Sequence, residues 1–557
     1  MADRTDAQTG ASAGKPATAG AAMPMRLSGL ERLYRQSGLF GWQLKGRQRD
    51  SLRPGLQDPW QGNAQRGVDI MAYRAAPAAS DTAHAGFAWL RDLRAEGGVE
   101  ARSRARDLIT EWIDANQAWR LPDWRPDLMG ERLAIIAMNY GWYGDSADEA
   151  FQSRLAHTVE MQLRCLAMDW RRMRSIDQQI GALRGLALAE AALGGEASRI
   201  EALQDMLFPK LRAAIHDDGG HVSRMPDRHI RLMRQLVEFR MATSFAGIDG
   251  SAISDSIIRM GAVARMWRHG DGRLTHFNGG GGISAEMAEE TLLRAGVRGK
   301  AVQQAPYSGF LRMGSGRTVV IMDAGNMVNG NTVTGDAMKG DAMTGDGDLI
   351  AGSGTLGFEM SVGPTQLVVN SGQMMKDPTL RRVMCSTAAH STLGLDNQNS
   401  SSPRDGRFAS ISGVEVGEAP GGLLAIGSHD GFERSHGILH HRKLYLKTGG
   451  SNLRGADHLE YTGAPGEIPN LAVIRFHLHP KVTAAMLANG SVLMKIRGSR
   501  VGWTFKADGA VTEIDNSVYF EDGVRQASQQ IVLKAVVSDI RTTGSHEIRW
   551  AFTRGAQ

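Results

Sequence analysis

A ten-residue polar segment, residues 217–226, carries the side chains best suited to chemistry in this sequence. It contains an acidic glycine turn followed by an imidazole (His221), a hydroxyl (Ser223) and a guanidinium (Arg224). An imidazole can take a proton near neutral pH, and a guanidinium can hold a carboxylate through two charge-assisted hydrogen bonds. Loops between rigid elements often carry such sites. The alternative is a structural loop in which His221 caps the turn and Arg224 ties down a helix end.

A second polar loop, residues 268–282, ends in four consecutive glycines. Glycine-rich loops can cradle a phosphate, but no Lys-Ser/Thr follows these glycines, so a phosphate site is disfavoured. The acidic repeat at residues 335–348 has oxygen ligands for calcium. Its spacing is not that of an EF-hand, so a surface loop is predicted there.

Two kinds of hydrophobic periodicity divide the chain. Apolar stripes at helical spacing run from about residue 87 to 295, with short connections that place neighbouring helices antiparallel. Such hairpins build a solenoid or a toroid, and the lack of a strict repeat disfavours a consensus solenoid. From residue 307 the period changes to two, which predicts an antiparallel sandwich. The predicted strands are 317–324, 357–362, 366–370, 422–429, 440–447, 473–479, 491–496, 502–506 and 530–536.

The composition is that of a soluble globular protein of two or three domains, with 557 residues and a net charge of +5. The mild basic excess is compatible with an acidic partner and does not predict nucleic-acid binding. Two cysteines, far apart in the chain, exclude a disulfide framework or a thiolate metal site. No run approaches the roughly 18 apolar residues of a membrane span, so no transmembrane segment is predicted.

The first residues differ in character from the rest of the chain. Residues 1–26 are mostly small and lack the continuous apolar core of a signal peptide, so we predict a disordered tail and a cytoplasmic location. Residues 27–42 are basic and amphipathic, with Leu30, Leu33 and Leu39 near helical spacing. We predict that this segment docks on the protein's own core. A helix lying on a membrane surface is the alternative.

Six short blocks follow one another across the change from helices to strands. Together they resemble the blocks of bacterial heparinase II/III-like proteins, and the resemblance covers about residues 27–552. The tetrapeptide at 123–126 (DWRP) with Arg132 resembles the Trp and Arg block of the family's helical domain. The six blocks are 217–226 (DDGGHVSRMP), 268–280 (RHGDGRLTHFNGG), 388–396 (AAHSTLGLD), 428–432 (SHDGF), 440–446 (HHRKLYL) and 474–480 (IRFHLHP).

The resemblance implies an α + β multidomain chain. An incomplete α/α toroid of helical hairpins would occupy residues 27–300, and an antiparallel β-sandwich residues 301–557. Characterised members of the family are lyases that cleave uronate-containing acidic polysaccharides by β-elimination, in the cleft between toroid and sandwich. That reaction needs a group that neutralises the uronate carboxylate, a base for the adjacent carbon acid and an acid for the leaving oxygen.

The resemblance also suggests which residues form the site. The candidate catalytic residues are His221 as base, Arg224 as carboxylate neutraliser, and His390. The candidate substrate contacts are Gln178, Gln179, Trp124, Arg132 and Asn278. Helical core packing is the alternative for Trp124. Zinc is a candidate cofactor, held by His390, Asp405 and His440 at spacings similar to those of the family; hydrogen-bonded structural histidines are the alternative.

The chain departs from the family's catalytic pattern at three places. Residues 177–179 (Asp-Gln-Gln) stand where active members carry an Asn-Asn-His motif. No tyrosine occurs between Tyr143 and Tyr307, although Tyr445 of the sandwich is a possible substitute. Of the family's His-x-His pair, Ala388 replaces the first histidine. We therefore keep two hypotheses, a polysaccharide lyase and a non-catalytic acidic-glycan-binding or envelope-maintenance protein. The resemblance implies the periplasm or cell envelope as the alternative location.

Overall fold

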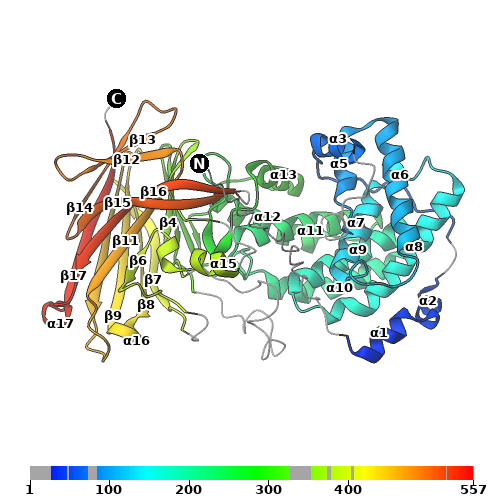
Figure 1. Cartoon of the computed structure of the whole chain (residues 1–557), viewed down its shortest axis with the longest axis horizontal. Coiled ribbons are helices and arrows are strands. Elements are labelled where there is room, and N and C mark those ends of the chain that lie inside the picture. The colour runs from blue at the N-terminus through cyan, green and yellow to red at the C-terminus, as the bar shows by residue number, and fades with distance from the viewer. Residues whose placement is uncertain are drawn as a thin grey trace, which may run out of the picture.

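A helical domain and a β-sandwich lie side by side along the long axis of the molecule (Figure 1). The computed structural model describes residues 27–46, 49–72, 85–326, 353–372, 378–402, 407–521 and 524–555. The change from helices to strands falls between α13, which ends at Ala295, and β1, which begins at Gln304. The predicted fold class is confirmed. The predicted tail at 1–26 and the acidic repeat at 335–348 lie outside the described residues.

The helices of the first domain form an inner and an outer row. In the inner row α5, α7, α9, α11 and α13 contact one another in that order, and α6, α8, α10 and α12 each contact the two inner helices that flank them. This alternation is that of α/α hairpins in an incomplete toroid. The bounds are α1 Gly29–Gln36, α2 Gly38–Leu44, α3 Ala64–Ala72, α5 Trp89–Glu96, α6 Gly98–Ala115, α7 Pro126–Tyr143, α8 Glu149–Asp169, α9 Ile176–Ala192, α10 Ala197–Ala214, α11 Pro226–Phe245, α12 Ser251–Met266 and α13 Ala285–Ala295.

Local sequence signals set where these helices begin. Pro126 and Pro226 occupy the first turns of α7 and α11, where a missing N–H costs nothing. Asp148 and Ser284 cap α8 and α13 by accepting backbone N–H groups of the first turn. The inner helices α7 and α9 are buried on nearly all sides, because each packs between two inner neighbours and the outer row.

The sandwich consists of two antiparallel sheets. The described strands of the first run in the order β1-β2-β3-β4-β5-β11-β16-β15, with β6 also paired to β11; those of the second run β12-β13-β14-β17-β10-β9-β8-β7. The bounds are β1 Gln304–Ala305, β2 Phe310–Ser315, β3 Thr318–Asp323, β4 Phe358–Val362, β5 Thr365–Val369, β6 Leu393–Leu395, β7 Ile411–Ala419, β8 Gly422–Phe432, β9 Ile438–Lys447, β10 Asn452–Tyr461, β11 Leu471–Leu478, β12 Val482–Met486, β13 Val492–Ile496, β14 Trp503–Asp508, β15 Val511–Glu521, β16 Val524–Val536 and β17 Ser545–Arg554.

Each domain has its own apolar core, and the helical core reaches into the first sheet. Between the sheets, Phe358 of β4 stacks on Trp550 of β17 with ring centroids 5.5 Å apart. On the other face of the first sheet, Phe310 of β2 packs edge-to-face against Trp267 at 5.2 Å and belongs to the helical core. The first sheet is therefore covered on one face by the second sheet and on the other by helices.

A close approach between α7 and α9 gives the first testable prediction. A Cβ on Gly185 would lie 2.3 Å from the carbonyl oxygen of Gly130, so the two helices touch through their backbones. We expect Gly185→Ala to lower the free energy of unfolding by about 1–3 kcal/mol, because overpacking outweighs the gain in helix propensity. Urea denaturation measures the change. The control is Gly41→Ala in α2, where a Cβ meets nothing within 4 Å; equal losses in both variants would contradict the packing argument.

Candidate functional site

The loop at 217–226 connects α10 to α11, and its imidazole is enclosed. His221 is 1% exposed. Its Nε2 lies 2.9 Å from Oδ1 of Asp177 on the first turn of α9, and its Nδ1 lies 2.7 Å from the Ser223 hydroxyl. Burial raises the pKa of Asp177, but the charges of His221 and Arg228 outweigh it and the net pKa is below the ordinary value. Both ring nitrogens of His221 are therefore engaged within the chain.

Arg224 ties the helical domain to the sandwich. Its Nη2 donates to Oδ1 of Asp323 at the end of β3, and its Nε donates to the Ser308 carbonyl at 2.8 Å. The guanidinium carbon lies 5.0 Å from the ring centre of Phe310. The side chain is only 4% exposed, so in this structure it holds a carboxylate of the protein itself. This geometry agrees with a tether, and the role of carboxylate neutraliser stays a prediction.

Asn278 serves the same contact between domains, whereas the glycines beside it bind a carboxylate of the helical domain itself. The Asn278 amide donates to the Arg224 carbonyl at 3.1 Å and to Oδ2 of Asp323 at 3.2 Å, and it is 3% exposed. The N–H groups of Gly281 and Gly282 donate to the two carboxylate oxygens of Asp227 at 3.1 and 2.8 Å. The glycines thus cradle an anion, but the anion is a side chain of α11.

A second buried carboxylate, Glu359 of β4, binds two histidines of the 268–282 loop. His269 contacts its Oε2 at 2.9 Å, and the backbone N–H of His276 donates to its Oε1 at 2.9 Å. Burial raises the pKa of Glu359, but its contacts with the two histidines outweigh burial and the net pKa is lowered. We call Arg224, His269, Asn278, Asp323 and Glu359 the interdomain seam. Sequence reasoning missed both carboxylates, although charged residues in apolar strands were a usable signal.

The remaining substrate contacts predicted in the helical domain are buried or half-buried. Arg132 is fully buried and donates to Gln162 Oε1 and to the carbonyls of Ala85 and Asp123 at 2.7–2.9 Å. Trp124 is 1% exposed. Neither reaches solvent in this structure, and their role as substrate contacts stays a prediction. Gln179 donates to the Met173 carbonyl at 2.6 Å, and Gln178 is half-buried on the first turn of α9.

The three predicted zinc ligands are placed as follows. His390 Nδ1 contacts the Ser386 carbonyl at 2.8 Å, and burial lowers the pKa of this imidazole. His440 contacts His429 through Nδ1 at 3.0 Å and Asp457 through Nε2 at 2.7 Å, so neither nitrogen is free for a metal. Asp405 lies outside the described residues. Within the described part of the chain, no group of three metal-binding side chains forms. Zinc stays a prediction.

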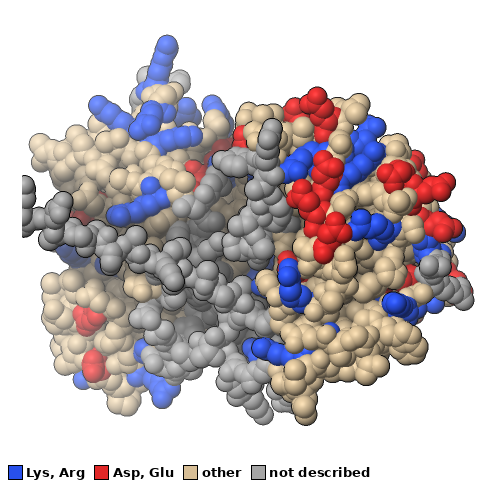
Figure 2. Space-filling model, turned by 45° about the vertical axis from the view of Figure 1, so that its right-hand side comes forward, with Lys and Arg blue, Asp and Glu red and all other residues tan. Residues whose placement is uncertain are grey.

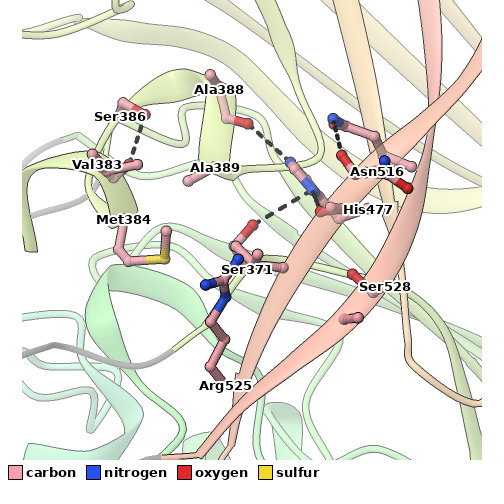
Figure 3. Close-up of a pocket in the computed structure, with 14 residues that line it drawn as sticks. Ser371, Val383, Met384, Ser386, Ala388, Ala389, His477, Asn516, Arg525 and Ser528 are labelled. Atoms are coloured by element: carbon pink, nitrogen blue, oxygen red, sulfur yellow. Dashed lines mark hydrogen bonds between the residues drawn. The ribbon is translucent and has the colours of Figure 1, made fainter. Parts of the chain in front are cut away.

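A pocket of about 590 Å³ opens in the sandwich beside Ala388 (Figure 3). One wall is the β15–β16 hairpin, and the other is α15 (Pro378–Met384) with the short helix Thr387–Ala389. Most polar lining groups are hydroxyls and amides, joined by one imidazole and one guanidinium. The lining residues are Ser371, Val383, Met384, Ser386, Ala388, Ala389, His477, Asn516, Ser517, Val518, Arg525, Ala527, Ser528 and Gln530.

The two titratable groups among these lining residues differ in availability. His477 Nε2 contacts the Ala388 carbonyl at 2.9 Å and Nδ1 contacts the Ser517 hydroxyl at 2.8 Å. Burial lowers the pKa of His477 to about 3, so the imidazole is neutral and fixed in the wall. Arg525 is exposed and lines the pocket (Figure 3), and no ion pair joins it to another described residue. Arg525 was not predicted, because no motif marks it.

Comparison with known proteins identifies the class. Residues 297–551 match the family model "Heparinase II/III-like, C-terminal", so this part of the chain is a heparinase II/III-like C-terminal domain. The resemblance inferred from the six blocks is confirmed. A solved heparinase III has a TM-score of 0.66 and 12% identity, covering 93% of this chain and 88% of its own. A mutant of the heparan sulfate lyase HepC from Pedobacter heparinus has a TM-score of 0.64 and 11% identity, covering 96% and 92%.

A relative named for a different property matches over most of its length. FtsZ-localized protein C of Caulobacter vibrioides (strain NA1000 / CB15N) is 28% identical over 492 residues, which is 84% of this chain and 81% of that protein. The solved lyases share the toroid-plus-sandwich architecture with this chain, and at their level of identity the likeness concerns the fold alone.

The Arg224–Asp323 ion pair gives the second prediction. Removing one partner leaves a buried charge uncompensated, so we expect Arg224→Ala to cost about 3–5 kcal/mol of unfolding free energy. Thermal and urea melts measure this loss. Lys534→Ala is the control, because its ion pair with Glu513 is largely exposed and should be worth about 1 kcal/mol or less. A similar small loss in both variants would refute the tether.

Buried histidines give the third prediction, on pH. The pKa of His477 in the folded protein is about 3 and that of His479 about 4, below the value of about 6.5 in an unfolded chain. The unfolded chain therefore binds more protons between these values, and stability falls as pH decreases from about 6.5. Each such histidine lowers the free energy of unfolding by up to about 1.4 kcal/mol for each unit that the pH falls in this range. Urea midpoints between neutral pH and pH 5 should drop less for His477→Gln than for wild type; identical slopes would contradict the assignment.

Proposed function

We propose that the protein binds a uronate-containing acidic glycan on a polysaccharide-lyase fold and does not cleave it by β-elimination. The observation that carries the proposal is the pocket beside Ala388. At the position where the family resemblance expects a proton-transferring histidine, the chain has a methyl group, and the space beside it is open. The pocket therefore keeps room for a sugar after losing the reactive imidazole.

The lining of the pocket suits recognition of an acidic sugar. Arg525 can hold a carboxylate or sulfate through charge-assisted hydrogen bonds. Asn516 and Gln530 can pair with sugar hydroxyls, together with the serines of the wall. Val383 and Met384 provide an apolar surface for the C–H face of a ring. A mainly apolar cavity with a few placed polar groups is the usual form of a small-ligand site.

Base catalysis lacks a free group among the described residues of this pocket. His477 holds the pocket wall through both ring nitrogens, and its low pKa makes it a poor proton acceptor near neutral pH. His221, the other candidate base, is enclosed by Asp177 and Ser223. A bound uronate would therefore keep the proton on the carbon next to its carboxylate, and β-elimination would not start.

Lyase activity is the second candidate function, and one observation favours it. Asp177 contacts Nε2 of His221, which would orient the imidazole and stabilise its protonated form, as a carboxylate does for a catalytic histidine. Nδ1 of His221 would act as base only after release from Ser223. The UV absorbance of an unsaturated uronate product distinguishes this candidate from simple binding.

A role in the cell envelope is compatible with the binding proposal. The relative from Caulobacter vibrioides carries a name that describes localisation with FtsZ and does not mention lyase activity. A glycan-binding member of the same fold would need affinity for its polymer and no turnover. Location in the periplasm or envelope remains part of this proposal; among the described residues, no helix is long and apolar enough to span a membrane.

The fourth prediction tests binding and catalysis together. Titration calorimetry of the full chain with heparan sulfate, hyaluronate, alginate and polygalacturonate should give binding to at least one polymer and no rise in unsaturated-uronate absorbance. Arg525→Ala should weaken that binding by about tenfold to a hundredfold, since a hydrogen bond to a charged group is worth about 1.5–3 kcal/mol.

Two controls make this result specific. Arg500→Ala removes an exposed arginine of the loop between β13 and β14 and should leave affinity unchanged. Lys506→Ala removes a charge from the outer face of the second sheet, which lines a different hollow. Loss of binding in Lys506→Ala but not in Arg525→Ala would place the glycan on that sheet and contradict the proposal. A time-dependent rise in absorbance would establish the lyase instead.

A further inference from the structure

The N-terminal helix pair, α1 and α2, presents its apolar side chains to solvent. It lies at the end of the helical domain away from the sandwich (Figure 1). Leu30, Leu33 and Tyr34 of α1 are 82%, 67% and 44% exposed, and Leu39 and Trp42 of α2 are 70% and 71% exposed. The segment docks on the protein's own core as predicted, but through Arg35 and Phe40 and not through these apolar positions.

The helix α1 is attached through its polar side. Its one buried residue is Arg35, which donates to both carboxylate oxygens of Asp169, at the end of α8, at 2.7 and 2.6 Å. The guanidinium carbon also lies 5.2 Å from the ring centre of Phe40. A surface helix normally buries its apolar stripe and exposes its charges. Here the arrangement is inverted, because an ion pair faces the protein and the leucines face outward.

The helix α2 adds its own exposed apolar side chains to those of α1. Phe40 and Leu44 anchor it in the core, so Leu39 and Trp42 point away from the protein. The Tyr34 hydroxyl donates to Gln43, and the Gln43 amide contacts the Met168 sulfur at 3.9 Å, which joins the exposed faces of α1, α2 and α8. We define the N-terminal apolar patch as Leu30, Leu33, Tyr34, Leu39, Trp42 and Met168.

The charges around the patch are mainly positive. Residues 28–45 expose the cations of Arg32 and Lys45, whereas Arg35 is buried against Asp169; their one acidic residue is Glu31. Glu31 is neutralised by Arg172 and Arg35, and the hydrogen bond from Arg172 is the main reason that its pKa falls to about 2. Elsewhere on the helical domain, acidic and basic side chains are interspersed, as Figure 2 shows for one face.

We propose that the N-terminal apolar patch binds the surface of a membrane that contains anionic lipid. Short helices with leucine and tryptophan on one face and basic residues beside it lie in the interface between headgroups and acyl chains. Tryptophan and tyrosine favour the headgroup level, and lysine and arginine are attracted to anionic headgroups. The Arg35–Asp169 pair holds the helix with its apolar face outward, so the membrane-facing surface forms without unfolding any part of the domain.

The test uses flotation of the full-length protein with vesicles. Wild type should float with vesicles of phosphatidylcholine and phosphatidylglycerol and several-fold less with phosphatidylcholine alone, and added salt should reduce the difference. The variant Leu33→Glu/Trp42→Glu should lower the partition by at least about tenfold, because two large apolar side chains no longer leave water. Both positions are exposed, so the melting temperature should remain that of wild type.

The matched control is Leu293→Glu/Val511→Glu, which makes the same charge change at two side chains that are 72% and 64% exposed elsewhere. It should float like wild type. Failure of wild type to float with any vesicle, or equal flotation of wild type and Leu33→Glu/Trp42→Glu, would overturn the proposal. Flotation independent of phosphatidylglycerol would overturn its anionic specificity. A dimer in light scattering that only the patch variant dissociates, without vesicle binding, would show that a second copy covers the patch.

Discussion

Two buried carboxylates hold the molecule together. Asp323 and Glu359 sit on neighbouring strands of the first sheet, 5% and 0% exposed, where an unpaired charge would be costly. Loops of the helical domain provide the partners of both carboxylates. Arg224 and Asn278 donate to Asp323. His269 and the backbone of His276 contact Glu359. The position of the toroid relative to the sandwich is therefore fixed by hydrogen-bond geometry as well as by apolar packing around Phe310.

The seam changes the meaning of the two polar loops. Their side chains have the composition of an active site, but Arg224, His269 and Asn278 join the domains. His221 and the glycines bind carboxylates of the helical domain. Charged groups that close a cleft cannot also hold a free ligand unless the contacts open. The exposed polar groups of the sandwich pocket have no such competing task, which is why we place ligand recognition there.

The fold could be read from the sequence more fully than the site. Strands with a buried, alternating face, such as Thr318–Asp323 and Val492–Ile496, were predicted almost to the residue. Several strands were missed. Ile411–Ala419 lies at a sheet edge and is partly or fully exposed along its length. The others include the interior strands Asn452–Tyr461 and Ser545–Arg554, although one face of each is buried. Site residues were identified by type, but their partners lie far along the chain: Arg224 and Asp323 are 99 positions apart. Spacing along the chain cannot show such pairings, and only the fold determines which carboxylate an arginine meets.

Position 224 illustrates how the seam constrains sequence change. Its backbone is left-handed, with φ of 57°, a conformation that is costly for a side chain and free for glycine. Asn278, which contacts it, is also left-handed at 53°, and asparagine tolerates that geometry better. Glycine at 224 would relax the backbone but leave Asp323 without its cation. Arginine provides the cation for Asp323 but leaves the backbone strained. A substitution there can either relax the left-handed backbone or provide a cation for Asp323, but not both. A change of residue at 224 therefore requires a compensating change at Asp323 on β3.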